Sequence, residues 1–322
     1  MANEGFAEPW IKFEQELGLR PNLYGPKVAD CFAGWEKLGG ALVSKYTFPA
    51  PDVSVATEDR TIGDGIKVRI YTPSGYAKGS KPVGMYIHGG GWAMGDLDMD
   101  DAGCRVMSKG ASVVLVSVDY RLAPQHPYPA GPDDCVTAYK WILENAESLG
   151  GVAGKVFIGG ASAGGNLVFT TALRIIDEGL GSSIVGLAAQ VPVTIHPDLV
   201  PADLKSKYTS YVEHAEHTVN TSSAMRAFFD AYGNPTDAYA NPLLSDKLSQ
   251  LPKVYMTVAG HDTLRDDGRL MKEKLESNGV QVKYDEYAGY PHYFWTFPAE
   301  VLKEPAAEYN ANLVKGIEFI LS

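Results

Sequence analysis

The sequence predicts an α/β fold in which a mostly parallel central sheet is flanked by helices. From about residue 80, short continuous apolar runs recur, as expected for strands that are buried on both faces. Stretches with helical spacing separate these runs, and such alternation gives a parallel sheet in a layered domain. The predicted strands cover residues 83–87, 113–118, 156–158, 187–193, 254–258 and 280–284. The helical stretches include residues 133–146, 165–178 and 306–321.

The segment before residue 80 has a different pattern. In residues 1–50, apolar side chains such as Trp10, Phe13 and Leu17 recur at helical spacing, which predicts amphipathic helices. Residues 52–72 alternate between apolar and polar side chains around a Gly-Asp-Gly turn at 63–65. This second pattern predicts a β-hairpin that leads into the sheet.

Residues 195–240 interrupt the alternation of strands and helices. They are polar and rich in Tyr, Phe and His, and their apolar positions suggest two or three helices. An insertion between core strands is expected to cover the carboxyl edge of the sheet, where ligands of α/β proteins bind. We therefore divide the chain into an N-terminal helical cap segment (1–50), a first core part (51–194), a cap insertion (195–240) and a second core part (241–322).

The bulk composition excludes several classes of function. The net charge of −11 argues against a basic face that binds nucleic acid or an anionic membrane. No apolar run of residues is long enough to span a bilayer. No apolar leader follows Met1, and Cys31, Cys104 and Cys135 lack the spacing of a disulfide framework. We expect unpaired thiols, a cytoplasmic location, and neither nucleic-acid nor membrane partners. The sequence leaves the oligomeric state open, a homodimer included.

Residues 160–164 read G-A-S-A-G directly after an apolar run, which is the nucleophile-elbow pattern G-x-S-x-G. The glycines are needed because a serine at a sharp strand-to-helix turn has a strained backbone and crowded neighbours. The helix that follows also favours negative charge near Ser162. The alternative is a glycine-rich turn without catalytic function. The motifs elsewhere in the chain distinguish between these two interpretations.

An H-G-G-G sequence begins at His88, directly after the strand predicted at 83–87. Glycines there let backbone N–H groups approach the oxygen on which charge develops during acyl transfer. Gly90, Gly91 and Ala163 are the expected donors of this oxyanion hole. A phosphate-binding loop is the competing interpretation, but neither G-K-[ST] nor G-x-G-x-x-G spacing occurs here.

A serine nucleophile of this type needs an acid and a base, in the chain order Ser, Asp, His. Asp262 follows the strand predicted at 254–258, and His292 lies in a turn-rich loop near the C-terminus. Asp266 and Asp267 come one turn later, where they would serve as first-turn charges of a helix. Asp262 and His292 are therefore the predicted acid and base.

His214, Glu216 and His217 form a cluster that could suggest a metal site. The pattern is H-x-E-H, which matches no zinc-protease spacing, and no third ligand pattern accompanies it. We interpret it as a polar helix face and expect neither a metal nor a cofactor.

Together these motifs closely resemble the hormone-sensitive-lipase-like branch of the α/β-hydrolase esterases, over residues 80–322. The shared motifs are H-G-G-G-W at 88–92, D-Y-R-L-A-P at 119–124, G-A-S-A-G-G at 160–165, D-T-L-R-D at 262–266 and G-Y-P-H at 289–292. The resemblance implies Ser162 as nucleophile, Asp262 as acid, His292 as base, and Gly90, Gly91 and Ala163 as oxyanion donors. It also implies that residues 1–50 and roughly 195–235 form the cap.

Two departures from the family pattern bear on mechanism. Ala161 stands where the family usually has an aspartate, so a supporting carboxylate is missing beside the nucleophile. His261 and Thr263 replace the more usual Tyr and Pro around the acid, and His261 is expected to influence the pH profile. The chain keeps both nucleophile and base, which favours hydrolysis over the receptor function of some relatives.

We therefore predict a carboxylesterase for a small-molecule ester with a short acyl chain, acting through an acyl-enzyme. The many aromatic residues suit an aromatic or secondary-metabolite alcohol, with Trp92, Phe229 and Trp295 as predicted pocket walls and Phe228, Tyr293 and Phe294 as further candidates. Any of these side chains would equally fit a core role. The alternatives are a lactonase or amidase with the same triad, or a non-hydrolytic small-molecule receptor.

Overall fold

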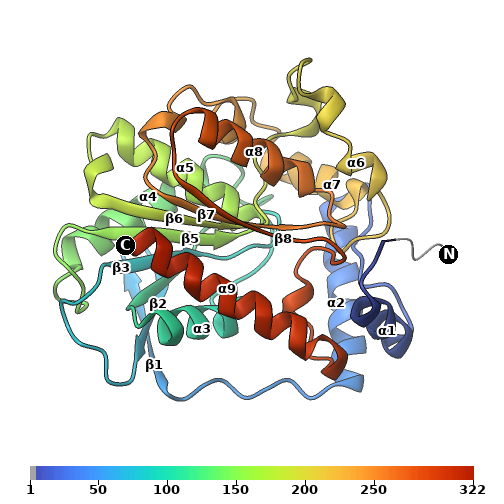
Figure 1. The fold of residues 1–322 in the computed structure, drawn as a ribbon, viewed down its shortest axis with the longest axis horizontal. Coiled ribbons are helices and arrows are strands. Elements are labelled where there is room, and N and C mark those ends of the chain that lie inside the picture. Colours follow the sequence, from blue (N-terminus) through green and yellow to red (C-terminus); the bar gives the residue numbers. More distant parts are fainter. Residues whose placement is uncertain (1–4) are drawn as a thin grey trace.

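A computed structural model describes residues 5–322, and its centre is an eight-stranded sheet with helices on both faces (Figure 1). The first four residues of the predicted cap segment lie outside the described range. The strands are β1 (Val55–Ile62), β2 (Ile66–Pro73), β3 (Val83–Ile87), β4 (Leu115–Asp119), β5 (Val156–Ala161), β6 (Ile184–Gln190), β7 (Val254–Ala259) and β8 (Val282–Tyr287). Their order in the sheet is β1-β2-β4-β3-β5-β6-β7-β8.

The strand directions match the predicted organisation. β1 and β2 form the antiparallel hairpin, and β2 pairs antiparallel with β4. Every neighbouring pair from β4 to β8 is parallel. The carboxyl ends of these parallel strands therefore meet at one edge, where loops from distant parts of the chain come together.

Helices of the core cover the two faces of the sheet, and further helices lie at one end of it (Figure 1). They are α1 (Glu8–Leu17), α2 (Val28–Lys45), α3 (Asp101–Ala111), α4 (Ala130–Asn145), α5 (Ala163–Asp177), α6 (Ser210–Glu213), α7 (Ser222–Tyr232), α8 (Arg265–Ser277) and α9 (Lys303–Leu321). α4, α5 and α8 cover one face, whereas α3 and α9 cover the other.

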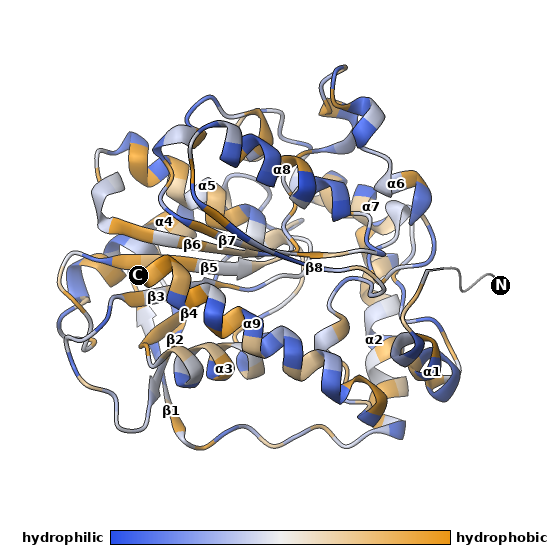
Figure 2. Ribbon diagram, in the orientation of Figure 1, coloured by the Kyte–Doolittle hydropathy of each residue, from blue (hydrophilic) through white to orange (hydrophobic). Residues whose placement is uncertain are grey.

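Alternation along the strands divides the core into two apolar layers. In β3, Met85 and Ile87 point into the layer beneath α4 and α5, while Tyr86 points into the layer that contains α3 and α9. The edge strand β8 is different, because it carries charged side chains and is only half-buried; Figure 2 colours it mostly hydrophilic. Charge at an exposed edge disfavours pairing with another chain.

The N-terminal segment and the insertion contact each other. The backbone N–H of Leu23 donates to the carbonyl of Val219 at 2.7 Å, and Leu23 forms an isolated bridge with Asn220. Helix α2 packs on α7. The two segments predicted to form the cap therefore contact each other at one end of the sheet (Figure 1).

Some boundaries differ from the predicted ones. β6 ends at Gln190 rather than at residue 193, because the chain turns at Val191, whose φ is +38°. β8 runs over 282–287 rather than 280–284, since its polar side chains do not form the apolar run used to find strands. Within residues 5–322, no helix is both long and apolar enough to cross a lipid bilayer.

Candidate active site

Ser162 occupies the sharp turn between β5 and α5. Its backbone is strained, with φ +57° and ψ −118°, a conformation that is uncommon for a residue with a side chain. Space for this turn depends on the two flanking glycines. A Cβ on Gly164 would lie 2.0 Å from the carbonyl oxygen of Ile87, and one on Gly160 would lie 2.6 Å from the carbonyl oxygen of Gly164. The turn therefore presents the serine only if both positions are glycine.

Replacing Gly164 with alanine is expected to lower the free energy of unfolding by about 3 kcal/mol, because the new methyl group must displace backbone rather than a flexible side chain. Gly103→Ala is the matched control, since a Cβ at that helical position meets nothing within 4 Å. Urea denaturation of both variants would measure the difference. Equal midpoints for the two variants would contradict this account of the turn.

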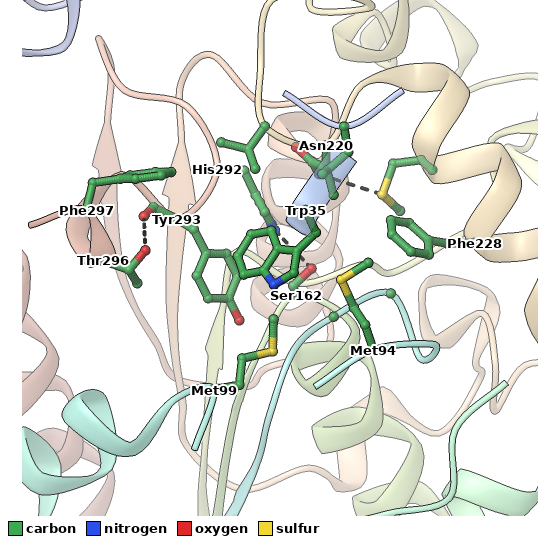
Figure 3. Close-up of a pocket in the computed structure, with 15 residues that line it drawn as sticks. Trp35, Met94, Met99, Ser162, Asn220, Phe228, His292, Tyr293, Thr296 and Phe297 are labelled. Atoms are coloured by element: carbon green, nitrogen blue, oxygen red, sulfur yellow. Dashed lines mark hydrogen bonds between the residues drawn. The ribbon is translucent and has the colours of Figure 1, made fainter. Parts of the chain in front are cut away.

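The structure brings the three predicted catalytic side chains together (Figure 3 shows Ser162 and His292). His292 Nε2 lies 2.9 Å from Ser162 Oγ, and His292 Nδ1 lies 2.5 Å from Asp262 Oδ2. A carboxylate only accepts, so Nδ1–H donates to Asp262 and Nε2 is left to accept the serine proton. All three side chains are buried, which strengthens their mutual interactions.

A backbone hydrogen bond orients the Asp262 carboxylate after the end of β7, because Asp262 Oδ1 accepts the backbone N–H of Leu264 at 3.0 Å.

Asp267 lies in the first turn of α8 as predicted, but it is fully buried. It accepts the backbone N–H groups of Thr194 and Ile195 and the hydroxyl of Tyr208. Burial raises the pKa of Asp267 to about 7. This carboxylate joins α8 to the insertion, a role that the sequence did not reveal.

The loop of the predicted oxyanion hole has the conformation that glycine permits. Gly90 and Gly91 both have positive φ, at +101° and +60°. Within residues 5–322, the backbone N–H groups of Gly90, Gly91 and Ala163 donate no hydrogen bond to the protein. They are thus available to a substrate oxygen. His88 orders the loop, since its Nδ1–H donates to the carbonyl of Gly89 at 2.8 Å, and burial lowers its pKa to about 4.

A pocket opens above Ser162, and the space between its walls is about 540 Å³ when the part that is open to solvent is included. Figure 3 shows Trp35, Phe228 and Met94 around the serine. The lining comes from the core, the N-terminal segment and the insertion: Leu23, Trp35, Gly90, Gly91, Met94, Met99, Ser162, Val219, Asn220, Met225, Phe228, His292, Tyr293, Thr296 and Phe297. The walls are mostly apolar, as is usual for a small-molecule site.

The three predicted wall residues do not line this pocket, so that part of the sequence interpretation is corrected. Trp92 is buried and stacks on Tyr232, with ring centroids 4.4 Å apart, and Phe229 packs beside Trp92. Trp295 stacks on Tyr309 at 3.8 Å. Flat aromatic partners in the core hold these rings.

Two of the further aromatic candidates do line the pocket, namely Phe228 and Tyr293, whereas Phe294 is fully buried in the core. Four further wall residues were not predicted from the sequence: Trp35 and the methionines Met94, Met99 and Met225. The two methionines that follow the H-G-G-G loop could have been found from their closeness to it in the chain. Nothing in the local sequence of Trp35 indicates that this residue reaches the serine.

The histidines around residue 215 do not form a metal cluster. His217 Nε2 contacts Glu14 at 3.0 Å, and His214 Nε2 contacts Arg265 at 3.0 Å. Across the described part of the chain, no group of three or more His, Cys, Asp or Glu side chains is arranged to hold a metal ion. His261 lies against Phe6 and His214, and its Nδ1–H donates to the carbonyl of Ala288.

Comparison with known proteins agrees with this geometry. Residues 84–296 match a family model described as the alpha/beta hydrolase fold. The chain therefore belongs to the α/β-hydrolases, in their hormone-sensitive-lipase-like branch of esterases. It is 45% identical over 316 residues, 98% of each protein, to versiconal hemiacetal acetate esterase of Aspergillus parasiticus. It is 38% identical over 261 residues, 78% of each protein, to carboxylesterase NlhH of Mycobacterium tuberculosis.

Solved structures resemble the whole chain as well. The crystal structure of vibralactone cyclase has a TM-score of 0.85 at 27% identity and covers 100% of this chain and 97% of its own. An esterase of Pyrobaculum calidifontis has a TM-score of 0.78 at 28% identity, with 98% and 100% covered. With esterases among its relatives, the protein is a carboxylic-ester hydrolase.

Proposed function

We propose that the protein is a serine carboxylesterase that removes a short acyl group, such as acetyl, from an aromatic or secondary-metabolite alcohol. The observation that carries the proposal is the chain of contacts from Ser162 through His292 to Asp262, which opens into a pocket of largely apolar walls. The contact between nucleophile and base argues against a receptor that only binds its ligand.

In the proposed mechanism, His292 Nε2 takes the proton of Ser162 Oγ while that oxygen attacks the ester carbonyl. The N–H groups of Gly90, Gly91 and Ala163 stabilise the resulting oxyanion, and each such donor contributes about 3 kcal/mol. The imidazolium then gives its proton to the leaving alcohol. Water, activated by the same histidine, hydrolyses the acyl-enzyme, and Asp262 holds the imidazole tautomer throughout.

The substrate class rests on the walls of the pocket and on the relatives. Trp35 and Phe228 provide flat faces, and three methionines provide adaptable apolar contacts. Side chains of this kind accept a rigid aromatic alcohol more readily than a polar one. The relative with 45% identity is named for an acetate ester, which supports a short acyl group.

An ester series tests this proposal. We expect the ratio kcat/KM to be highest for acetate and butyrate and to fall steeply towards laurate when p-nitrophenol is the common alcohol. Aryl acetates should be better substrates than aliphatic acetates of similar size. Paraoxon, a serine-reactive organophosphate, should add to Ser162, as mass spectrometry of the peptides would show. A flat profile across aliphatic and aryl esters would contradict the substrate class.

The second candidate reaction is lactone hydrolysis, which a lactone added to the same series would test. The same triad can open lactones, and the fold is shared with a protein named vibralactone cyclase. Hydrolysis of the lactone in preference to every open-chain ester would replace the esterase assignment.

We also propose a cytoplasmic location, which the three buried and unpaired cysteines support.

A further inference from the structure

Asp100 is a further buried carboxylate, and it contacts the loop of the predicted oxyanion hole. Asp100 directly precedes α3, where an aspartate ordinarily accepts hydrogen bonds from the first turn of its own helix. Its side chain makes no such bond. Instead, Asp100 Oδ2 accepts the backbone N–H of Gly89 at 3.2 Å and the hydroxyl of Tyr86 at 3.1 Å. The carboxylate therefore holds the loop of residues 88–91 rather than its own helix.

Tyr293 connects this carboxylate with the loop of the proposed base. It follows His292 directly and has a left-handed backbone, with φ +59°, which is unusual for an aromatic residue. Its buried hydroxyl lies against Gly89, where a Cβ would be only 2.2 Å away. The hydroxyl makes no hydrogen bond of ordinary geometry within the described residues, yet its proximity helps to lower the pKa of Asp100.

The charge of Asp100 is coupled to the site. Burial raises the pKa of Asp100 to about 6, while its hydrogen bonds and the charge of His292 act in the opposite direction. The ionisable groups that face Asp100 from neighbouring elements are Tyr86, Cys104, Tyr120, His292, Tyr293 and Tyr309.

The position of this carboxylate bears on Ala161, the residue before the nucleophile. Tyr86 pairs with Gly159 in the sheet, and side chains alternate along a strand, so Ala161 faces the same side as Tyr86. Gln190, which pairs with Ala161, accepts the hydroxyl of Tyr309 on that side. Ala161 places no carboxylate on this side of the sheet, whereas Asp100 places one there through its bond with Tyr86.

We propose that Asp100 is a positioning residue for ester hydrolysis, which holds the loop of the predicted oxyanion hole in place through its bond with Gly89. The inference rests on the proposed function. It predicts that Asp100 affects kcat rather than KM, because Asp100 is not among the residues that line the pocket.

Three variants test it, with p-nitrophenyl acetate as substrate. Asp100→Ala should lower kcat roughly tenfold at nearly unchanged KM, which is less than the loss from a direct oxyanion donor. Asp100→Asn keeps an acceptor for Gly89 but removes the charge. Because the acceptor is kept, its kcat should stay within about threefold of wild type.

Asp101→Asn is the matched control, because it makes the same change one residue further on, where the carboxylate binds Arg69 and Arg105 away from the site. We expect kcat and KM of this control to match those of wild type. If a folded Asp100→Ala keeps the kcat of wild type, the positioning role is wrong. Where Asp100→Ala fails to fold, a folded Asp100→Asn that loses more than about tenfold in kcat refutes the role, because that variant keeps the acceptor for Gly89. If the wild type neither hydrolyses esters nor reacts with paraoxon at Ser162, the proposed function itself fails, and the role of Asp100 with it.

Discussion

Ser162→Ala is expected to reduce the kcat of p-nitrophenyl ester hydrolysis by about 10⁵- to 10⁶-fold, because no other group at the site can form the acyl-enzyme. The fold should be unaffected, since the change removes only the Oγ atom and its bond to His292. Steady-state kinetics would measure the loss, and circular dichroism with thermal unfolding would verify the fold.

Labelling by paraoxon is the control for this variant. The wild type should gain one organophosphate adduct on the peptide that contains Ser162, and the variant should gain none there. Undiminished turnover by a folded Ser162→Ala protein would overturn the mechanism. An adduct on another serine of the variant, together with residual activity, would reassign the nucleophile.

Asp262→Asn is expected to lower kcat by about 10⁴-fold. The carboxylate accepts from His292 Nδ1 at 2.5 Å, and an amide would instead favour the tautomer in which Nε2 carries the proton and cannot accept from Ser162. The geometry of the site should be preserved because asparagine has nearly the same shape. Kinetics at several pH values would separate this tautomer effect from a simple shift of the profile.

Asp267→Asn is the matched control, because it makes the same change at another fully buried aspartate of the same region. Asp267 bonds to the backbone of residues 194 and 195 and does not contact His292. We expect kcat within a few-fold of wild type, with an effect mainly on the free energy of unfolding. Similar large losses in kcat for both variants would mean that Asp262 acts through structure rather than through the imidazole.

The fold and the proposed catalytic side chains could be predicted because each rests on a local pattern. Buried parallel strands require apolar runs, and a serine at a tight turn requires glycine on both sides. Both features can therefore be recognised in short stretches of the sequence. The chain order of Ser162, Asp262 and His292 then fixes which strand ends carry them. The structure places these three side chains in contact, although their chemical roles stay predictions.

The pocket walls could not be predicted in the same way. Trp35 reaches the site only because α2 packs on α7, a contact between segments that are far apart in the chain. Trp92 and Trp295 lie beside predicted site loops in sequence, yet flat aromatic partners in the core hold their rings. Asp100 is a similar case, because its position before a helix predicts a cap and only the folded chain reveals its bond to Gly89.

The pairing of Leu23 with residues of the insertion has a consequence for engineering substrate preference. Leu23 lines the pocket, its N–H donates to Val219, and its carbonyl accepts the hydroxyl of Thr221. A chimera that imports only the insertion from a relative risks leaving these buried groups unpaired, at about 1–3 kcal/mol each. We therefore expect the two segments to behave as one module, split in sequence but in contact in space, so that a graft intended to alter specificity should carry both.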